Sequence, residues 1–500
     1  MTDLTNGAPT RRTILKQITV GAAVVGWSAA SGSWAPAGAD TAGVAALPRL
    51  DGTITIAPEV LAKFGKDWGN LKSGAPKAVL RPGSVRDIVA MVRYARANKL
   101  KIAMNGHGGS GPAADHESHS NYGQALVPGG IAIDSKGLST IHSIGTTSAW
   151  VDAGVTWAQL VDATLARGRT PAAHTGYQHL SVGGTASIGG IGGMVQKQGL
   201  QIDTITEIEI VTGEGYVVRA SATERPDLFN AALGGGGQVG IITKARVKLV
   251  PAPARVAVFT LVYQDLATFV ADSEMLMRDG RFDAQDSGPR LKADGTGWYY
   301  RIDGVAFYNP GSPPDRAALL AGLHDDQASR EFGDLPFRDW SFRLDAFEVS
   351  AKEGGFWYQP HPWLSLLIPG SKIVEFARTV LGQTTAADMG IGFSLMYPFS
   401  SAKLTRPLYK LPNEPVVYLF DLLRMPFPND PNVPSMMAQN RRIYDLAVSL
   451  GGKRYIMGAI PGMTVEDWRR HFGSDWDRLV AAKRRYDPDN VLTPGQGFFG

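Results

Sequence analysis

A glycine-rich loop and a nearby histidine are the residues of this chain whose types and spacing could do chemistry. The loop is Gly106-His107-Gly108-Gly109-Ser110-Gly111, and it follows a short alternating run from Lys101 to Asn105. Glycines let several backbone N–H groups crowd around one anion, so the loop could hold a phosphate group. Further along come His119, Ser120 and Gln124, and the histidine imidazole can act as a nucleophile. Taken alone, the pattern fits an ordinary glycine-rich surface loop equally well.

A second glycine-rich segment runs from His179 to Gly193 and holds six glycines in fifteen residues. Each glycine inside a helix is about 1 kcal/mol less favourable than alanine, so this segment should not form a stable helix interior. Such a composition suits backbone that packs closely against a planar or phosphorylated ligand. The two segments together predict a cofactor site.

Two other interpretations of the first loop were weighed. Gly106-x-Gly108-x-x-Gly111 matches the nicotinamide dinucleotide fingerprint, but Pro112 and a polar run follow where that fingerprint needs a helix. The run from Asp115 to His119 contains carboxylates and histidines that could bind a metal. Histidines grouped on a loop are more often solvated than metal-bound, and no metal site is predicted.

The elements that must position these residues can be read from periodicity. A strand at Ala78–Leu80 leads into a helix that starts at Ser84, with Asp87 as its capping-box partner, and ends near Asn98. The run Lys101–Asn105 reads as the next strand, so a β-α-β unit leads into the glycine loop. Further strands are predicted at Ile131–Asp134, Trp150–Gly154, Ile205–Val211, Tyr216–Ala220 and Ile241–Leu249, with helices at Trp157–Leu165, from Asp227, and near the C-terminus from Asp467.

Composition excludes several classes of protein. The 500 residues are 44% apolar and 19% charged, which predicts a globular protein of two or three domains. No cysteine is present, so disulfides, thiolate metal sites and flavin bonds through sulfur are excluded. The net charge is only +4 and no block of Lys and Arg occurs, which argues against a nucleic-acid partner. Apolar runs after the N-terminal segment are short, so no stable membrane span is expected.

The N-terminal segment has the pattern of an export signal. Thr10-Arg11-Arg12-Thr13-Ile14-Leu15-Lys16 is a twin-arginine sequence, and an apolar run from Ile18 to Ala30 follows it. Ala37-Gly38-Ala39 then supplies small residues suited to cleavage. We predict that residues 1–39 are a twin-arginine signal peptide outside the mature fold, and that the protein is exported to the periplasm or the extracellular space.

Several motifs resemble cytokinin dehydrogenases, a branch of the vanillyl-alcohol-oxidase superfamily with a PCMH-type FAD-binding domain. The resemblance spans about Ala75 to Phe499 and depends on the order of its motifs, each of which is modest alone. The motifs are His119-Ser120-x-x-Gly123-Gln124-Ala125, the segment Thr175 to Thr185, Gly234 to Thr243, His361-Pro362-Trp363-Leu364, Trp468-x-x-His471-Phe472-Gly473 and the closing Pro494-Gly495-Gln496.

The resemblance implies an α+β protein of two domains. An FAD-binding domain would comprise residues 50–253 and 456–500, and a substrate domain rich in aromatic residues would comprise residues 254–455. FAD would be bound covalently through His119, with His107 as the competing attachment site. The other implied FAD-binding residues are Gly106, Gly108, Gly109, Ser110, Ser120, Gln124, Gly176, Ser181, Gly183, Gly184, Ser187, Ile191, Ile242, Thr493 and Gln496.

Three departures from the family pattern are present: the first bears on which histidine holds the flavin, and those at Gly176 and Ala459 bear on the substrate. In the family the histidine directly follows the glycine loop, whereas extra residues separate the loop from His119 in this chain. The family's catalytic aspartate falls on Gly176, which has no side chain to accept a proton. A family tyrosine before the C-terminal helix falls on Ala459. These changes argue against cytokinin itself as the substrate.

The functional prediction is an exported FAD-dependent oxidase or dehydrogenase. It would transfer a hydride from a CH–OH or CH–NH carbon of a small apolar, aromatic or allylic substrate to flavin N5, and oxygen or a quinone would take the electrons. The base would be Asp303, Tyr177 or His174. The alternatives are a cytokinin-type amine dehydrogenase, a carbohydrate-oxidising relative and a redox-inactive flavin-fold binding protein.

Overall fold

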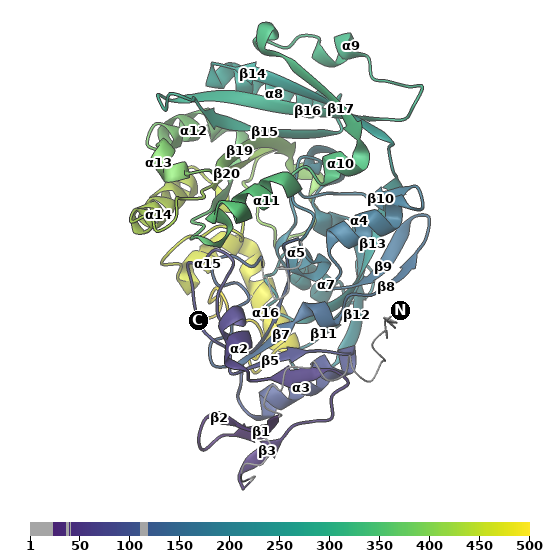
Figure 1. Cartoon of the computed structure of the whole chain (residues 1–500), viewed down its shortest axis with the longest axis vertical. Coiled ribbons are helices and arrows are strands. Elements are labelled where there is room, and N and C mark those ends of the chain that lie inside the picture. The colour runs from purple at the N-terminus through teal and green to yellow at the C-terminus, as the bar shows by residue number, and fades with distance from the viewer. Residues whose placement is uncertain (1–23, 37–39, 41, 111–118) are drawn as a thin grey trace, which may run out of the picture.

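The computed structural model describes residues 24–36, 40, 42–110 and 119–500. Figure 1 shows the middle of the chain, coloured teal to green, in the upper half of the molecule, and the earlier segments in the lower half. The C-terminal helices α15 (Val465–Phe472) and α16 (Trp476–Tyr486) return to the lower half. The mixture of helices and sheets confirms the α+β prediction. The domain limits drawn from the resemblance stay predictions.

A four-stranded sheet carries the first glycine loop. Its order is β4-β5-β7-β6, and both β5 and β6 run parallel to β7. Alternate residues of these strands enter two different apolar clusters, so both faces are buried. The loop begins where β6 ends. The elements are β4 (Thr53–Thr55), α2 (Pro58–Phe64), β5 (Ala78–Arg81), α3 (Val85–Ala97), β6 (Ile102–Asn105) and β7 (Ile131–Asp134), which confirms the predicted β-α-β unit.

The predicted capping box at the start of α3 is wrong. Ser84 is the N-cap residue, but its side chain makes no capping hydrogen bond and donates instead to Asp51. The buried Asp87 carboxylate accepts from the backbone N–H groups of Asp51, Gly52 and Gly83. Asp87 therefore fastens the preceding segment to the helix, because three fixed donors outcompete the local cap.

A larger antiparallel sheet carries the second glycine-rich segment. Its order is β12-β11-β13-β9-β8, and β10 also pairs with β13. Its strands are β8 (Ile141–Ile144), β9 (Ser148–Asp152), β10 (Arg169–Pro171), β11 (Ile205–Val211), β12 (Val217–Ser221) and β13 (Ile241–Pro251). The accompanying helices are α4 (Trp157–Leu165), α5 (Val182–Ile188), α6 (Val195–Gln198) and α7 (Pro226–Ala232).

Helix α5 corrects the expectation that the second glycine-rich segment contains no helix. Gly183 and Gly184 lie in its first turn. A Cβ atom on Gly183 would lie 2.6 Å from Cβ of Ala153, so the helix fits against the sheet only with glycine there. Tertiary packing thus overrides the poor helix propensity of the sequence.

Two four-stranded antiparallel sheets build the upper half. Their orders are β15-β16-β14-β17 and β19-β20-β18-β21. The strands are β14 (Arg255–Tyr263), β15 (Ala284–Leu291), β16 (Trp298–Tyr308), β17 (Glu331–Pro336), β18 (Leu364–Pro369), β19 (Phe393–Ser400), β20 (Val416–Leu423) and β21 (Lys453–Arg454). The helices are α8 (Leu266–Asp279), α9 (Arg316–Leu320), α10 (Phe337–Ser341), α11 (Asp345–Glu353), α12 (Ile373–Leu381), α13 (Ala386–Met389) and α14 (Val433–Ser449).

The C-terminal turn is tied to the strand that precedes the glycine loop. Ile102 in β6 donates its N–H to the carbonyl of Val491, and its own carbonyl accepts from the N–H of Thr493. Buried Lys483 in α16 donates to the Asp487 carboxylate at 2.6 Å. The first loop and the last residues of the chain are therefore neighbours.

Part of the predicted signal segment is folded in the intact chain. β1 (Val24–Ser28), β2 (Ser33–Pro36) and β3 (Val44–Ala46) form a small sheet at the bottom of Figure 1. Trp27 and Trp34 in this sheet pack against Tyr94 of α3, whose ring stacks on Trp34 with centroids 5.7 Å apart. The twin-arginine sequence and the small-residue cleavage segment lie outside the described residues, so cleavage stays a prediction.

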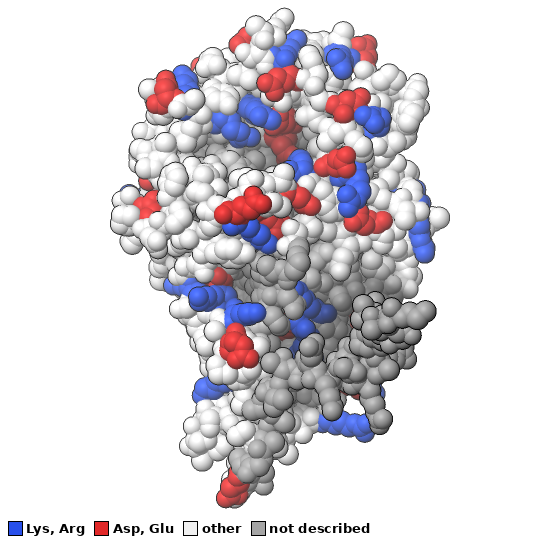
Figure 2. Space-filling view, in the orientation of Figure 1, with Lys and Arg blue, Asp and Glu red and all other residues white. Residues whose placement is uncertain are grey.

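On the face shown in Figure 2, blue basic and red acidic side chains are interspersed over the described residues and form no continuous basic patch. None of the described helices combines the length and the apolar character that a membrane crossing requires.

Candidate active site

A cavity of about 730 Å³ is lined by residues of both halves of the molecule. The lower half contributes the two glycine-rich segments and the C-terminal turn, and the upper half contributes β15, β16, β19, β20 and α11. Its volume lies within the range of about 300–1,000 Å³ that is usual for pockets of cofactors and small molecules. The predicted cofactor segments, distant in sequence, therefore meet at one place.

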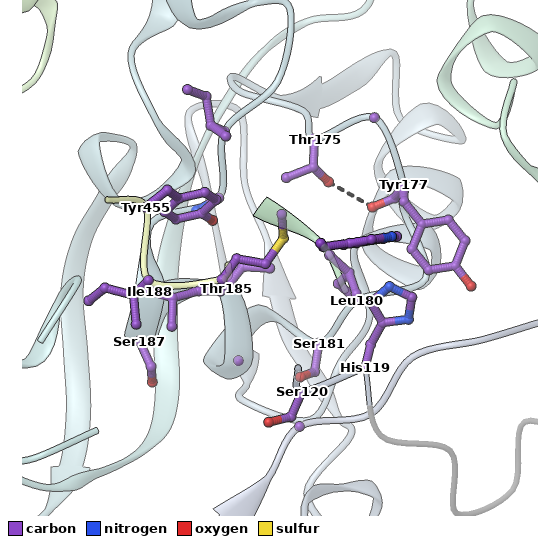
Figure 3. A pocket seen from close by; sticks show the side chains of 18 of the residues that line it. His119, Ser120, Thr175, Tyr177, Leu180, Ser181, Thr185, Ser187, Ile188 and Tyr455 are labelled. Atoms are coloured by element: carbon purple, nitrogen blue, oxygen red, sulfur yellow. Dashed lines mark hydrogen bonds between the residues drawn. The ribbon is translucent and has the colours of Figure 1, made fainter. Parts of the chain in front are cut away.

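The predicted attachment histidine lies at this cavity. The ring of His119 stacks on Trp68 with centroids 4.0 Å apart and lies 5.1 Å from the ring of Tyr177 (Figure 3). Desolvation by burial lowers the pKa of His119 to about 3. The imidazole is therefore neutral at physiological pH and keeps the lone pair that a nucleophile needs.

His107 also lines the cavity but is held differently. Its Nε2 lies 2.6 Å from the carbonyl oxygen of Gly154, which can only accept, so Nε2 carries the proton. Burial lowers the pKa of His107 as well. Its ring is anchored to the large antiparallel sheet, whereas the ring of His119 lies among aromatic side chains.

Most predicted cofactor residues line the cavity. Figure 3 shows Ser120 and Ser181 at the lower centre of the view, and Ser187 with Tyr455 at the left. The amide of Gln124 donates to the carbonyl of Ile456, as does the amide of Gln496, so the two glutamines meet at one backbone atom. The predicted residues that line the cavity are Gly106, His107, His119, Ser120, Gln124, Gly176, Tyr177, Ser181, Gly183, Gly184, Ser187, Ile191, Ile242, Asp303, Thr493 and Gln496.

Three residues of the first glycine loop do not line the cavity, namely Gly108, Gly109 and Ser110. Gly108 instead supports the histidine, because a Cβ atom there would lie 2.6 Å from Cβ of His119. The N–H of Ser110 donates to the Glu348 carboxylate at 2.7 Å. His119 therefore lies directly against the loop although the two are separated in the sequence.

His174, one of the three predicted bases, does not line the cavity either. It is 3% exposed, and its Nε2 lies 2.8 Å from the hydroxyl of Thr170. Its ring packs against Phe337 and Trp340, and burial lowers its pKa to about 3. His174 follows a buried strand, and its side chain therefore turns into the core rather than toward the cavity.

Strand register places four charged residues on one wall of the cavity. Asp286 in β15 pairs with Asp303 in β16, and Gly288 pairs with Arg301. Because side chains alternate between faces along a strand, Asp286, Arg290, Arg301 and Asp303 share one face. All four line the cavity.

The predicted base Asp303 is already engaged on one oxygen. Its Oδ1 accepts from the guanidinium of Arg301 at 2.8 Å and from the hydroxyl of Thr260 at 2.9 Å. Asp286 pairs with Arg343 at 2.6 Å. The upper wall therefore presents fixed ion pairs that can orient a polar ligand.

The predicted base Tyr177 is part of a buried network. Its hydroxyl donates to Oε2 of Glu348 at 2.7 Å, and Lys352 pairs with Oε1 of the same carboxylate at 2.8 Å. Burial opposes ionisation of Glu348, but the hydrogen bonds from Lys352, Tyr177 and the Ser110 N–H outweigh it and lower its pKa. Glu348 thus stays charged and fixes the Tyr177 ring beside His119.

A second, apolar wall holds one carboxyl group. In β20 the sequence from Val416 to Leu423 contains a single charged residue, Asp421, which pairs with Leu395 of β19 and Ser365 of β18. Asp421 lines the cavity although it is only 2% exposed. Desolvation by burial raises its pKa to about 8, so the group is mainly neutral at pH 7.

Sequence reasoning missed Asp421, Glu348 and Arg290 as residues of the cavity. Asp421 carried a usable signal, because one acid in an otherwise apolar strand must find a special environment. Glu348 and Arg290 carried none, since they lie on ordinary amphipathic elements and only the packing of those elements brings them to the cavity.

One group among the described residues has the composition of a metal site. Three side chains, those of His179, Asp345 and Glu348, each offer one possible ligand atom. These three atoms lie within 4.8 Å of one another. The ammonium of Lys352 lies 2.8 Å from Glu348, where it would repel a cation, and His179 pairs with Asp345 at 3.0 Å. Apart from His119, the earlier candidate run beginning at Asp115 lies outside the described residues.

Comparison with known proteins gives the family. Residues 294–499 match the family described as "Cytokinin dehydrogenase 1, FAD and cytokinin binding", and residues 76–221 match "FAD binding domain". The chain is 36% identical over 435 residues to "Uncharacterized oxidoreductase ORF5 in fasciation locus" of Rhodococcoides fascians, covering 87% of this chain and 96% of that protein.

Plant relatives are similar over the same length. The chain is 34% identical over 490 residues to Cytokinin dehydrogenase 9 of Oryza sativa subsp. japonica, covering 90% of this chain and 91% of that protein. It is 32% identical over 493 residues to Cytokinin dehydrogenase 1 of Arabidopsis thaliana, covering 90% and 83%. The resemblance seen in the motifs is therefore confirmed, and this chain belongs to the cytokinin dehydrogenase-like family of FAD-dependent oxidoreductases.

Proposed function

We propose that the protein oxidises a CH–OH or CH–NH carbon of a small organic substrate that binds between the cofactor segments and the upper wall of the cavity. One observation carries this proposal: a single cavity joins the FAD-type segments to a wall that combines apolar side chains with fixed ion pairs. A cofactor and its substrate need such a shared, largely enclosed space.

The residues of the lower half suit FAD. Backbone of Gly106, Gly183 and Gly184 can approach a phosphorylated ligand closely, and Gln496 has a buried side-chain oxygen without a hydrogen-bond partner among the described residues. When bound, FAD would supply the two-electron acceptor for the oxidation. The same segments, with His119 and Ile242, would hold it.

We further propose that FAD is attached covalently to His119. The support is the neutral imidazole at the cavity, the nearby aromatic rings that restrict its orientation, and the Gly108 backbone behind it. A covalent bond would retain the cofactor in an exported protein, and export by the twin-arginine route is part of the same proposal.

The upper half would bind and orient the substrate. Trp357, Trp363 and Phe393 line the cavity and would exclude water from an aromatic or allylic group. Asp303, held by Arg301, would accept a hydrogen bond from a polar end of the substrate through its second oxygen. Tyr177 would fix the substrate beside the cofactor through the hydroxyl that Glu348 orients.

The substrate class separates this proposal from its alternatives. The relatives named as cytokinin dehydrogenases favour an amine, whereas Gly176 in place of the family's aspartate favours an alcohol as much as an amine. Anaerobic mixing of the purified protein with panels of allylic and benzylic alcohols and amines, followed by the visible flavin spectrum, tests this directly. Bleaching by at least one compound is expected.

Bleaching by amines alone would favour the cytokinin-type reaction. No bleaching by any compound would contradict the proposal and favour a redox-inactive binding protein. Mixing the reduced protein with oxygen and, separately, with a quinone then identifies the electron acceptor from the rate at which the yellow colour returns.

A further inference from the structure

Asp421 is the most unusual titratable group of the cavity. It stands on the apolar face of β20 between Leu419 and Leu423, and the cross-strand neighbour on the same face is Leu395. All three leucines line the cavity with it. A charged acid on this face is unfavourable for stability because apolar neighbours cannot solvate the charge, and such perturbed groups cluster at functional sites.

The carboxyl group also lacks the partners that hold the other acids of the cavity. Within the described part of the chain, the hydroxyl of Ser365 on the neighbouring strand interacts with the Asp421 carboxyl and favours its charged form, but Oδ1 of Asp421 has no other hydrogen-bond partner. Asp303 is paired with Arg301, and Glu348 is paired with Lys352. Asp421 is therefore available to a ligand without a counter-ion, whereas each of the other two carboxylates is held by a cation.

The titratable groups that face Asp421 do not supply a compensating charge. Tyr397 on β19, and Tyr409 and Tyr455 beyond it, are tyrosines whose pKa values burial raises further. Asp286 and Arg343 also act on Tyr397, and they neutralise each other as an ion pair. The proton on Asp421 is thus controlled by desolvation, by the Ser365 hydroxyl and by whatever occupies the cavity.

We propose that Asp421 is the catalytic base that accepts the O–H or N–H proton of the substrate. This inference rests on the proposed function and assigns a group to the step that Gly176 cannot perform. The heteroatom–hydrogen bond breaks and its proton passes to the ionised Asp421 carboxylate. The C–H hydrogen leaves with its electron pair for the FAD acceptor, a C=O or C=N bond forms, and the substrate loses two electrons.

The chemistry of the site suits this role. A desolvated carboxylate is a stronger base than an exposed one, and a base works best when its pKa lies near the working pH. Burial raises the pKa of Asp421 to about 8, which makes the ionised carboxylate a stronger base. The same shift leaves a smaller fraction of the carboxyl group ionised at pH 7. The rate of substrate oxidation should consequently rise with pH through the weakly alkaline range.

The test uses the full-length FAD-loaded protein and Asp421→Asn, which keeps the shape of the side chain but cannot take a proton. Asp334→Asn is the matched control, since it changes the same residue type at a carboxylate that Arg255 neutralises on exposed β17, outside the cavity. The rate of anaerobic flavin bleaching is measured across pH with a substrate that bleaches the wild type. Asp421→Asn should lower it by about 10²–10⁴-fold and abolish the alkaline rise, whereas Asp334→Asn should retain the rise.

Infrared spectroscopy gives a readout independent of turnover. The difference spectrum between wild type and Asp421→Asn at neutral pH should contain the carbonyl band of a protonated carboxylic acid, and this band should fade as the pH rises. A rise in rate that survives in Asp421→Asn, or absence of the band, would overturn the assignment. Failure of the proposed function is distinguishable, because then the wild type itself would not bleach.

Discussion

His119 and His107 are both candidates for the flavin bond, and their environments differ. His107 is fixed by donating from Nε2 to Gly154, whereas His119 lies among aromatic rings with a neutral imidazole. A covalent bond needs a nitrogen lone pair directed at the cofactor. Residue chemistry alone leaves both open, and the packing favours His119.

We predict that His119→Ala abolishes covalent flavin, while His107→Ala keeps it. The measurement is acid precipitation followed by the visible spectrum of the pellet, with mass spectrometry of the labelled peptide. Yellow colour should stay with the wild-type polypeptide and with His107→Ala, and should leave His119→Ala. The reverse pattern would assign the bond to His107, and colour lost from all three proteins would mean noncovalent FAD.

The buried carboxyl group of Asp421 should also make the folding stability depend on pH. Its folded-state pKa of about 8 lies above the ordinary aspartate value of 3.8, so the folded protein holds a proton that the unfolded chain releases. Folding stability therefore falls as the pH rises from about 4 to about 8, and the loss at pH 7 is on the order of 4 kcal/mol before relaxation.

Asp421→Asn should remove this loss, because asparagine has no proton to release. Its unfolding temperature should exceed that of the wild type, and the difference should widen between pH 5 and pH 8, as thermal denaturation followed by circular dichroism can measure. Asp286→Asn should give no such widening, since the Asp286 carboxylate is paired with Arg343. An unfolding temperature of Asp421→Asn that tracks the wild type at every pH would contradict the buried neutral carboxyl.

At the level of single elements, helix α5 shows how packing selects glycine. Its seven residues carry two glycines, a composition that would not form a helix in isolation. The helix exists because Gly183 packs directly on Ala153 at the end of β9 and so brings Gly184 to the cavity wall.

Gly183→Ala should therefore overpack this contact and destabilise the protein by about 1–3 kcal/mol. FAD affinity should fall as well, because the displaced backbone lines the cavity. Gly333→Ala is the matched control, since it lies on exposed β17 with no atom closer than 3.6 Å to the added Cβ. Denaturant unfolding and FAD titration of the apoprotein measure both effects, and a Gly183→Ala protein as stable as Gly333→Ala would refute the close packing.

The strands of the upper half illustrate a second element-level rule. Alternation along β15 and β16 sends Asp286, Arg290, Arg301 and Asp303 to one face, and alternation along β20 sends Asp421 to another wall of the same cavity. The alternation can be read from the sequence. Which face meets the cavity depends on the packing of the two sheets.

At the scale of the whole molecule, the N-terminal strands raise the question of what the mature protein retains. β1 and β2 lie within the predicted signal, yet Trp27 and Trp34 are buried against Tyr94. The cavity and the sheet that carries the first glycine loop contain no residue of these strands. The fold around FAD should therefore survive their removal.

We predict that a chain starting at Asp40 folds and binds FAD but loses about 1.5–3 kcal/mol for each of the two buried tryptophans. N-terminal sequencing of the exported protein should begin near Asp40, and thermal unfolding with FAD retention compares the two lengths. Export should fail when Arg11 and Arg12 are replaced by lysine. A shortened chain that cannot bind FAD, or an exported protein that keeps Trp27, would show that these strands belong to the mature fold.

Much of the organisation is determined by the sequence itself. Periodicity located β5, α3, β6 and β7, because short apolar strands and amphipathic helices leave distinct spacings. Motif order located the cofactor segments, because backbone contact with a phosphorylated ligand needs glycine in any fold that provides it. Composition excluded disulfides and sulfur-linked flavin outright, since no cysteine is present.

Only the tertiary structure decided how these parts meet. It placed His119 against Gly108, turned His174 into the core, and brought Glu348 and Asp421 to the cavity from separate elements. Such contacts depend on the relative placement of sheets and helices, and a linear pattern records the spacing within an element but not the distance between elements. Burial also depends on that placement, which is why the unusual proton affinity of Asp421 emerged only from the folded chain.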